Sequence, residues 1–277
     1  MGLRIATNVQ SLSGQRSLNQ VKRDQASSLE KLSSGSRINK AGDDAAGLAI
    51  SEKLKSNIRG VKQATRNAGD GISLIQTAEG AMNEVNNILI RLRELSVQSA
   101  SDTIGDKERV YSDMEFQQLV TEVERIATST TFNEKQLLSG EGEDMEFQIG
   151  IHNVEKNDRI NYNASESSIK AEALGIEGLT VSTKGDSQEN LETLDGAINK
   201  VNTNRANLGA LQNRLQSTVR NLEIKSENLS GANSRIRDTD IAEESAKLAM
   251  ANILTASSTS VLAQANNASA GALQLIG

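Results

Sequence analysis

The residues that could carry chemistry are few in this chain and poorly placed for it. Its only histidine is His152, and there is no cysteine. The lack of cysteine excludes thiolate nucleophiles, and a single histidine excludes a zinc site with two histidine ligands. A Ser-His-Asp triad would depend on His152 alone. Asp43-Asp44 and Glu243-Glu244 are adjacent pairs, whose carboxylates would point in different directions on a helix. We expect these pairs to favour helix N-termini, and we predict no enzymatic activity, no metal and no cofactor.

Phosphate and nucleic-acid chemistry are also disfavoured. The chain has no G-x-x-x-x-G-K-[ST] loop, and Gly69-Asp70-Gly71 is better interpreted as a packing or curvature site. The net charge is −6, and the basic residues near the start follow a helical pattern without stacking aromatics. We therefore predict that the chain does not bind nucleic acid.

Composition indicates the elements that must position any site. The 277 residues include no Pro, Trp or Cys, three Phe and two Tyr, so the core must come from Leu, Ile, Val, Ala and Met. Average usage would give about 5% Pro. Its absence favours long helices, which do not tolerate a missing N–H donor.

Apolar periodicity predicts three helices before residue 130. An amphipathic helix is expected from about Leu3 to Leu32, followed by a break at 33–36. A long helix is expected over about 45–99 and a shorter antiparallel one over about 106–129, after a turn at 101–105. The long helix carries three apolar columns, as in a bundle: Ile75, Met82, Leu89; Ala78, Val85, Leu92; Leu74, Ala81, Ile88, Leu95.

The middle of the chain changes to a period of two. Residues 145–151 and 159–163 alternate apolar and polar side chains, which predicts a β-hairpin with a loop at 152–158. After Gly185 the helical period returns and predicts a helix of forty-odd residues. Seven apolar residues follow one another there at a spacing of seven: Leu194, Val201, Leu208, Leu215, Leu222, Leu229 and Ile236.

The last thirty residues, 248–277, contain no Asp, Glu, Lys or Arg. They are too polar to cross a bilayer, and no run of eighteen apolar residues occurs elsewhere, so we predict no membrane insertion. Burying the segment's eight Leu, Ile and Val side chains would contribute roughly 12–24 kcal/mol as an upper bound. A single copy offers little to bury them against. We therefore predict a small-residue helix that packs against other copies of the chain.

Several long motifs resemble bacterial flagellin. The opening residues 4–8 (RIATN) and the segments 29–39 (LEKLSSGSRIN) and 41–50 (AGDDAAGLAI) are similar to that family, as are 76–81, 91–98, 131–133 and 259–266. One departure is Glu134, where many members carry Gly. The middle also leaves room only for a hairpin element, so the chain resembles a short flagellin without large outer domains.

The resemblance implies a mainly α fold, a long antiparallel helical bundle or coiled-coil rod with a small β-hairpin element in the middle. The expected divisions are an inner-tube helix at 1–35, a connecting segment at 36–46, rod segments at 47–139 and 188–237, the hairpin element at 140–187 and a second inner-tube helix at 238–277. The subunit contacts are expected from apolar residues of the two ends: Ile5, Val9, Leu12, Ile253, Leu254, Val261, Leu262, Leu273 and Leu275.

The family also implies a function and partners. Its members polymerise into the extracellular flagellar filament for motility, are exported without a cleaved signal peptide by the flagellar type III apparatus and bind an export chaperone. They join hook-associated and cap proteins. In some members an Arg-x-Arg-Glu-Leu motif contacts a Toll-like receptor, which here implies Arg91, Leu95 and Glu115. Those residues equally fit ordinary surface and bundle packing, and both interpretations can hold.

Two alternatives stay open. A hook–filament junction protein would share the two ends, but the matches through the rod disfavour it. A monomeric adhesin or immune ligand would have to solvate the charge-free C-terminal segment, which disfavours that alternative too.

Overall fold

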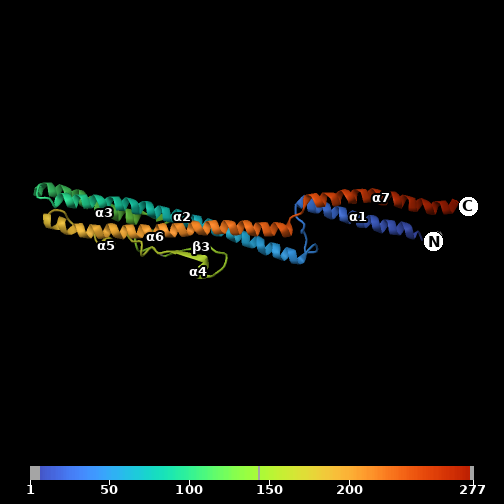
Figure 1. The fold of residues 1–277 in the computed structure, drawn as a ribbon, viewed down its shortest axis with the longest axis horizontal. Helices are drawn as coiled ribbons and strands as arrows, with labels where there is room; N and C mark the ends of the chain where they lie inside the picture. The colour runs from blue at the N-terminus through green and yellow to red at the C-terminus, as the bar shows by residue number, and fades with distance from the viewer. Residues whose placement is uncertain (1–6, 143, 275–277) are drawn as a thin grey trace. The chain divides into compact units, whose positions relative to one another are not determined.

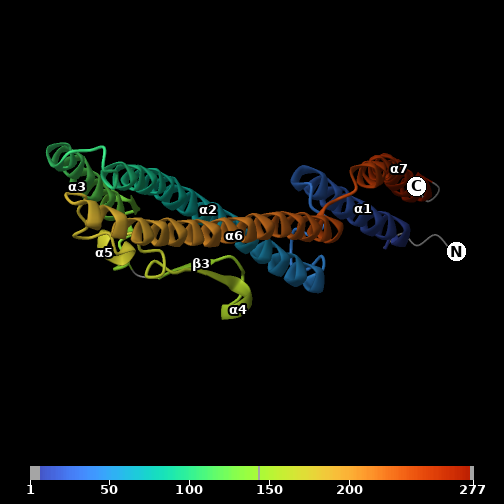
Figure 2. The same cartoon turned by 60° about the vertical axis from the view of Figure 1, so that its left-hand side comes forward.

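The structure is a computed structural model that describes residues 7–142 and 144–274, with side chains described as far as Asn267. It is mainly α-helical with small antiparallel strand pairs, as predicted (Figures 1 and 2). The chain divides into two compact units. We call Met1–Asn57 with Asn228–Gly277 the terminal unit, and Ile58–Glu227 the central unit.

Two antiparallel helices dominate the terminal unit, α1 (Val9–Ser34) and α7 (Ile241–Gln274). They lie side by side in both ribbon views. The Asn8 side chain accepts a hydrogen bond from the Ser11 amide at 3.1 Å and so caps the first turn of α1. Helix α1 therefore begins at Val9 rather than near Leu3 as we expected.

The segment that follows α1 is held by backbone hydrogen bonds. Gly35 ends α1 with a φ of 67°, a left-handed conformation that suits glycine. The Arg37 amide then donates to the Arg237 carbonyl at 2.6 Å. Asp44 accepts from the Gly47 amide at 2.8 Å, so this aspartate has the N-terminal capping role expected of the Asp43-Asp44 pair.

The core of the central unit lies between α2 (Ala45–Ser99), α3 (Asp106–Ser129) and α6 (Lys184–Arg237). The predicted spans 45–99 and 106–129 are confirmed, whereas α6 has 54 residues and is longer than the forty-odd predicted. Buried residues include most of the predicted columns: Leu74, Ile75, Ala78, Met82, Val85, Leu89, Leu92, Leu95, Leu194, Val201, Leu208, Leu215 and Leu222.

The predicted hairpin is confirmed as β3 (Met145–Gln148) paired with β4 (Arg159–Tyr162). Its loop is more ordered than expected, because it contains the short helix α4 (Glu155–Asp158). A second short helix, α5 (Ala171–Leu174), precedes α6. The hairpin packs on α2, where a Cβ at Gly71 would lie 3.3 Å from Phe147 and from Leu215. Gly71 is therefore a packing site, as the sequence suggested.

A smaller hairpin was not predicted. Strands β1 (Thr131–Phe132) and β2 (Lys135–Gln136) pair through a two-residue turn at Asn133-Glu134. Both turn residues have positive φ, 50° and 66°, which a type I′ turn requires. Asn tolerates this conformation, whereas in a glutamate the Cβ lies too close to the following carbonyl oxygen, which destabilises the turn.

We expect Glu134→Gly to raise the stability of the monomer by about 1 kcal/mol, because glycine removes the left-handed strain. Thermal unfolding followed by circular dichroism would measure the gain. Asn133→Gly is the matched control and should gain less, since Asn already adopts a positive φ readily. Equal effects of the two substitutions would contradict this account of the turn.

Candidate self-association surface

Helices α1 and α7 approach each other closely, but most of the apolar side chains between them are only half-buried. A Cβ at Gly14 of α1 would lie 3.3 Å from the Leu262 side chain of α7. Among the described residues of the terminal unit, the only buried apolar ones are Ile38 and Ala251. The two helices alone therefore do not form a hydrophobic core.

Polar contacts fix the register of the pair instead. The Asn8 side chain donates to the Ala265 carbonyl at 2.9 Å, and the Gln25 side chain donates to that of Asn252 at 2.6 Å. The Ser11 hydroxyl also donates to the Asn266 side chain, at 2.8 Å. These contacts run in opposite directions along the two helices and so confirm an antiparallel arrangement.

A buried carboxylate lies near the start of α7. Glu244 is only 6% exposed and accepts a hydrogen bond from Ser28 of α1, which is itself buried. That hydrogen bond lowers the pKa of Glu244 below its usual value, and the charges of Lys31 and Lys247 act in the same direction. Sequence reasoning placed Glu244 at a helix N-terminus but missed this contact, because no local pattern marks its partner.

Most of the described side chains predicted to make subunit contacts are exposed. This group is Val9, Leu12, Ile253, Leu254 and Val261. Leu262 is half-buried against α1. Ile5 and Leu275 lie outside the described residues, and so does the side chain of Leu273.

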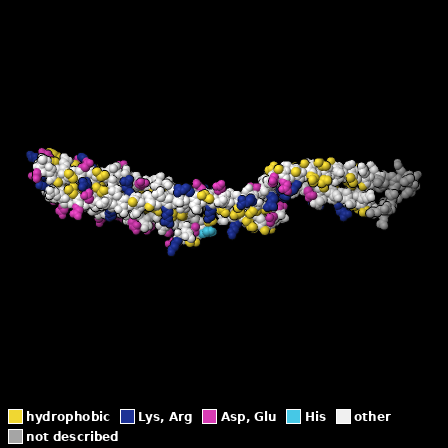
Figure 3. Space-filling view, viewed as in Figure 1, with side chains coloured by type: hydrophobic (Ala, Val, Ile, Leu, Met, Phe, Trp, Pro, Cys, Tyr) yellow, Lys and Arg dark blue, Asp and Glu magenta, His cyan; other side chains and the backbone are white. Residues whose placement is uncertain are grey.

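The pair exposes further apolar residues that the sequence analysis did not single out, namely Leu29, Ile241 and Met250. Figure 3 shows yellow side chains gathered on the face of α7 that is turned to the viewer. Charged residues are absent from α7 after Lys247. We call the exposed apolar residues of α1 and α7 the apolar stripe: Val9, Leu12, Leu29, Ile241, Met250, Ile253, Leu254 and Val261.

A groove of about 640 Å³ follows the line where α1 meets α7. Small side chains form it, including Ser13, Gly14 and Ser17 of α1 and Ser257 and Ser258 of α7. Small residues leave room for another backbone to approach closely. None of the described helices is long and apolar enough to cross a bilayer.

The three residues of the predicted receptor contact are divided between surface and core. Arg91 of α2 donates to Glu115 of α3 at 2.9 Å and to Glu94 at 3.1 Å. Those two hydrogen bonds raise the pKa of Arg91, whose charge is retained in any case. Leu95 is 2% exposed and belongs to the core of the central unit. The structure thus joins Arg91 with Glu115 but leaves almost none of Leu95 accessible.

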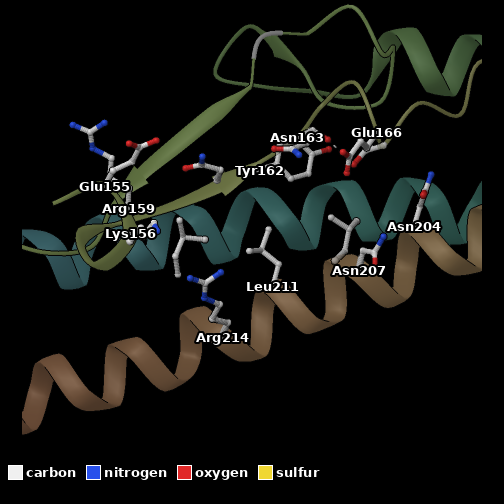
Figure 4. Close-up of a pocket in the computed structure, with 14 residues that line it drawn as sticks. Glu155, Lys156, Arg159, Tyr162, Asn163, Glu166, Asn204, Asn207, Leu211 and Arg214 are labelled. Atoms are coloured by element: carbon white, nitrogen blue, oxygen red, sulfur yellow. Dashed lines mark hydrogen bonds between the residues drawn. The ribbon is translucent and has the colours of Figure 1, made fainter.

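A second groove, of about 690 Å³, separates the β3–β4 hairpin from α6 (Figure 4). Its carboxylates, Glu155 and Glu166, lie towards opposite ends of the groove and do not form a pair. The Tyr162 hydroxyl donates to the Leu137 carbonyl at 2.7 Å, and burial raises its pKa, so it is a poor proton donor or nucleophile. No three His, Asp or Glu side chains gather in a metal-binding arrangement within the described part of the chain.

Two family models match the chain. The bacterial flagellin N-terminal helical region matches residues 5–143, and the bacterial flagellin C-terminal helical region matches residues 191–276. Together they cover the segments that form α1, α2, α3 and α7 and most of α6.

Individual proteins agree with these matches. A flagellin of Halalkalibacterium halodurans is 47% identical over 248 residues, 90% of each chain. A flagellar filament core protein of Brachyspira hyodysenteriae is 42% identical over 287 residues, covering 98% of this chain and 99% of its own. The crystal structure of Bacillus cereus flagellin superposes with a TM-score of 0.51 at 30% identity, covering 57% of this chain and 88% of that one.

Proposed function

The chain belongs to the bacterial flagellin family and is a structural subunit of the flagellar filament; from that premise we propose that α1 and α7 form its inner subunit contacts. Filaments of this family are extracellular. In this proposal residues 1–35 and 238–277 line an inner tube, 47–139 and 188–237 form the surrounding rod, and 140–187 adds the hairpin element. Residues 36–46 connect tube and rod.

The observation that carries this proposal is the combination of an exposed apolar stripe with an almost absent core in the terminal unit. Each apolar side chain moved from water into a packed contact contributes about 1.5–3 kcal/mol. A second copy supplies the surface that a single terminal unit lacks. An open helical polymer requires heterologous contacts, and the different residues that α1 and α7 present are consistent with such contacts.

Other partners follow from the same exposed helix. Before assembly the apolar residues of α7 need to be covered, which favours binding of an export chaperone to this segment; passage through the flagellar type III apparatus is proposed from the family alone. Contacts with hook-associated and cap proteins would use the same terminal helices. We propose no enzymatic activity, and the separation of Glu155 from Glu166 in the hairpin groove supports that proposal.

The experiment that tests filament formation is negative-stain microscopy of the purified full chain after seeding or salting out. Filaments are the expected result. A soluble, protease-resistant monomer under every condition would overturn the inner-contact proposal and favour the monomeric adhesin or immune ligand instead.

Recognition by a Toll-like receptor remains a proposal, and the Arg91–Glu115 pair supports it as an exposed, charged feature. We expect Arg91→Ala to reduce reporter-cell activation at least tenfold. Its unfolding temperature should change little, because an exposed ion pair is screened by solvent and contributes little to stability. Reporter-cell titrations alongside thermal melts would measure both quantities.

Arg93→Ala is the matched control for Arg91→Ala. Arg93 lies on the same helix and also forms an exposed ion pair, with Asp195 at 2.6 Å. We expect this variant to keep full receptor activation. Equal activation by the two variants would count against a receptor role for Arg91.

A further inference from the structure

The methionines of the chain differ sharply in their exposure. Met82 and Met145 are buried, at 0% and 9% exposure, whereas Met114 of α3 is 62% exposed and Met250 of α7 is 64% exposed. Met1 lies outside the described residues. A thioether reacts with peroxides only where the oxidant can reach the sulfur. Met114 and Met250 are therefore the two described sites open to that chemistry.

Met250 lies within the apolar stripe. On a helix, residues separated by four or eleven positions share one face, which places Met250 in line with Leu254 and Val261. Those two residues are 46% and 54% exposed. Neither carries a hydrogen-bonding group. A contact made along this line of α7 therefore packs the Met250 side chain against these two apolar neighbours.

We propose that Met250 is an oxidation site whose state controls self-association of the chain. Hydrogen peroxide transfers one oxygen atom to the sulfur, the O–O bond breaks, an S–O bond forms and water leaves. The sulfur is oxidised by two electrons and the peroxide is reduced. The proposal rests on the assembly role of the terminal helices.

The physical effect comes from a change in polarity. Methionine is flexible and apolar, whereas its sulfoxide carries a strongly polar oxygen that requires a hydrogen-bond donor. Buried beside Leu254 and Val261, that oxygen loses its water, and neither of these side chains offers a donor in its place. Oxidised monomers should therefore add poorly to a growing polymer.

The site is expected to be sensitive before assembly and protected after it. In the monomer the side chain is open to solvent, so peroxide reaches the sulfur freely. In the polymer the same side chain would be covered by a second copy. Thiol-dependent methionine sulfoxide reductases reduce the sulfoxide back to the thioether, which makes the change reversible.

The test uses two full-length variants that each keep one exposed methionine. Met114→Leu retains Met250, and Met250→Leu retains Met114, while the other methionines are common to both. Monomers are treated with hydrogen peroxide, the oxidant is removed with catalase, and assembly is seeded. Pelleting gives the critical concentration, and peptide mass spectrometry gives the oxidised fraction at each methionine.

We expect oxidation to raise the critical concentration of Met114→Leu at least tenfold and to leave that of Met250→Leu unchanged. Treatment of the oxidised protein with methionine sulfoxide reductases should restore assembly. Peroxide applied to preformed filaments should oxidise Met250 much more slowly than in monomers.

Three results would overturn the proposal: normal assembly of Met114→Leu despite an oxidised Met250, equal inhibition of both variants, or oxidation of Met250 in filaments at the monomer rate. Failure of the untreated chain to form any filaments would instead contradict the assembly role itself. The untreated samples therefore separate the two failures.

Discussion

We expect a chain carrying Ile253→Gln and Leu254→Gln to form no filaments at concentrations where the unaltered chain polymerises. Both side chains belong to the apolar stripe, and Gln keeps the helix propensity of this position close to that of Leu. Losing the burial of two such side chains costs about 3–6 kcal/mol per subunit. That cost raises the critical concentration by roughly 10²–10⁴-fold. Seeded pelleting with negative-stain microscopy measures it.

The matched control is Ile224→Gln, which removes an equally exposed apolar side chain from α6 in the central unit. We expect this variant to assemble with a critical concentration close to that of the unaltered chain. Normal filament formation by the full chain with Ile253→Gln and Leu254→Gln would contradict the proposal that the terminal helices make the subunit contacts. Deletion of 1–35 and 240–277 should abolish filaments in the same assay.

We expect Leu89→Ala to destabilise the monomer by about 2–5 kcal/mol, because it leaves a cavity in a fully packed site. Leu89 is 0% exposed and lies in the core formed by α2, α3 and α6. For a chain of this size each kcal/mol shifts the unfolding temperature by roughly 2–4 °C. Circular dichroism at 222 nm, recorded during heating of the monomer, would measure the shift.

The neighbouring residue provides the control. Ile90 follows Leu89 on the same helix but is 43% exposed, so Ile90→Ala leaves no closed cavity. We expect its effect to stay below about 1 kcal/mol, since surface substitutions away from special features change stability little. If the two variants had the same unfolding temperature, the assignment of Leu89 to a closely packed core would be wrong.

The long helices were predictable because their signal is repeated many times along the chain. Leu194, Val201, Leu208 and Leu215 recur at a fixed spacing, and all four are buried in the structure. The β3–β4 hairpin was also predictable, since alternation over 145–148 and 159–162 marks two half-buried strands. Because the pattern is repeated many times, the prediction of these elements did not depend on any single residue.

Short elements lacked such a signal. Strands β1 and β2 have two residues each, too few to show a period, and their turn carries Glu134 where a glycine would have marked it. The helix α4 occupies four residues of a loop that looked irregular. Helix α1 begins late because the Asn8 cap decides its first turn.

The candidate site was only partly contained in the sequence. A segment without charged residues led us to predict that α7 packs against other copies of the chain, because moving apolar side chains out of water lowers the free energy. The sequence also identified Arg91, Leu95 and Glu115 as one motif-derived group. It did not show which of the three side chains are exposed on the same surface, because helical spacing does not reveal which face of a helix a neighbouring helix covers.

The tertiary structure decided those relations. Packing of α2 against α3 joins Arg91 to Glu115 and buries Leu95. Packing of α1 against α7 turns Leu262 inward and leaves Val261 and Met250 outward. Composition and periodicity determine how much apolar surface a helix must bury. The side that is covered depends on contacts between different helices, such as Arg91 with Glu115 and Asn8 with Ala265.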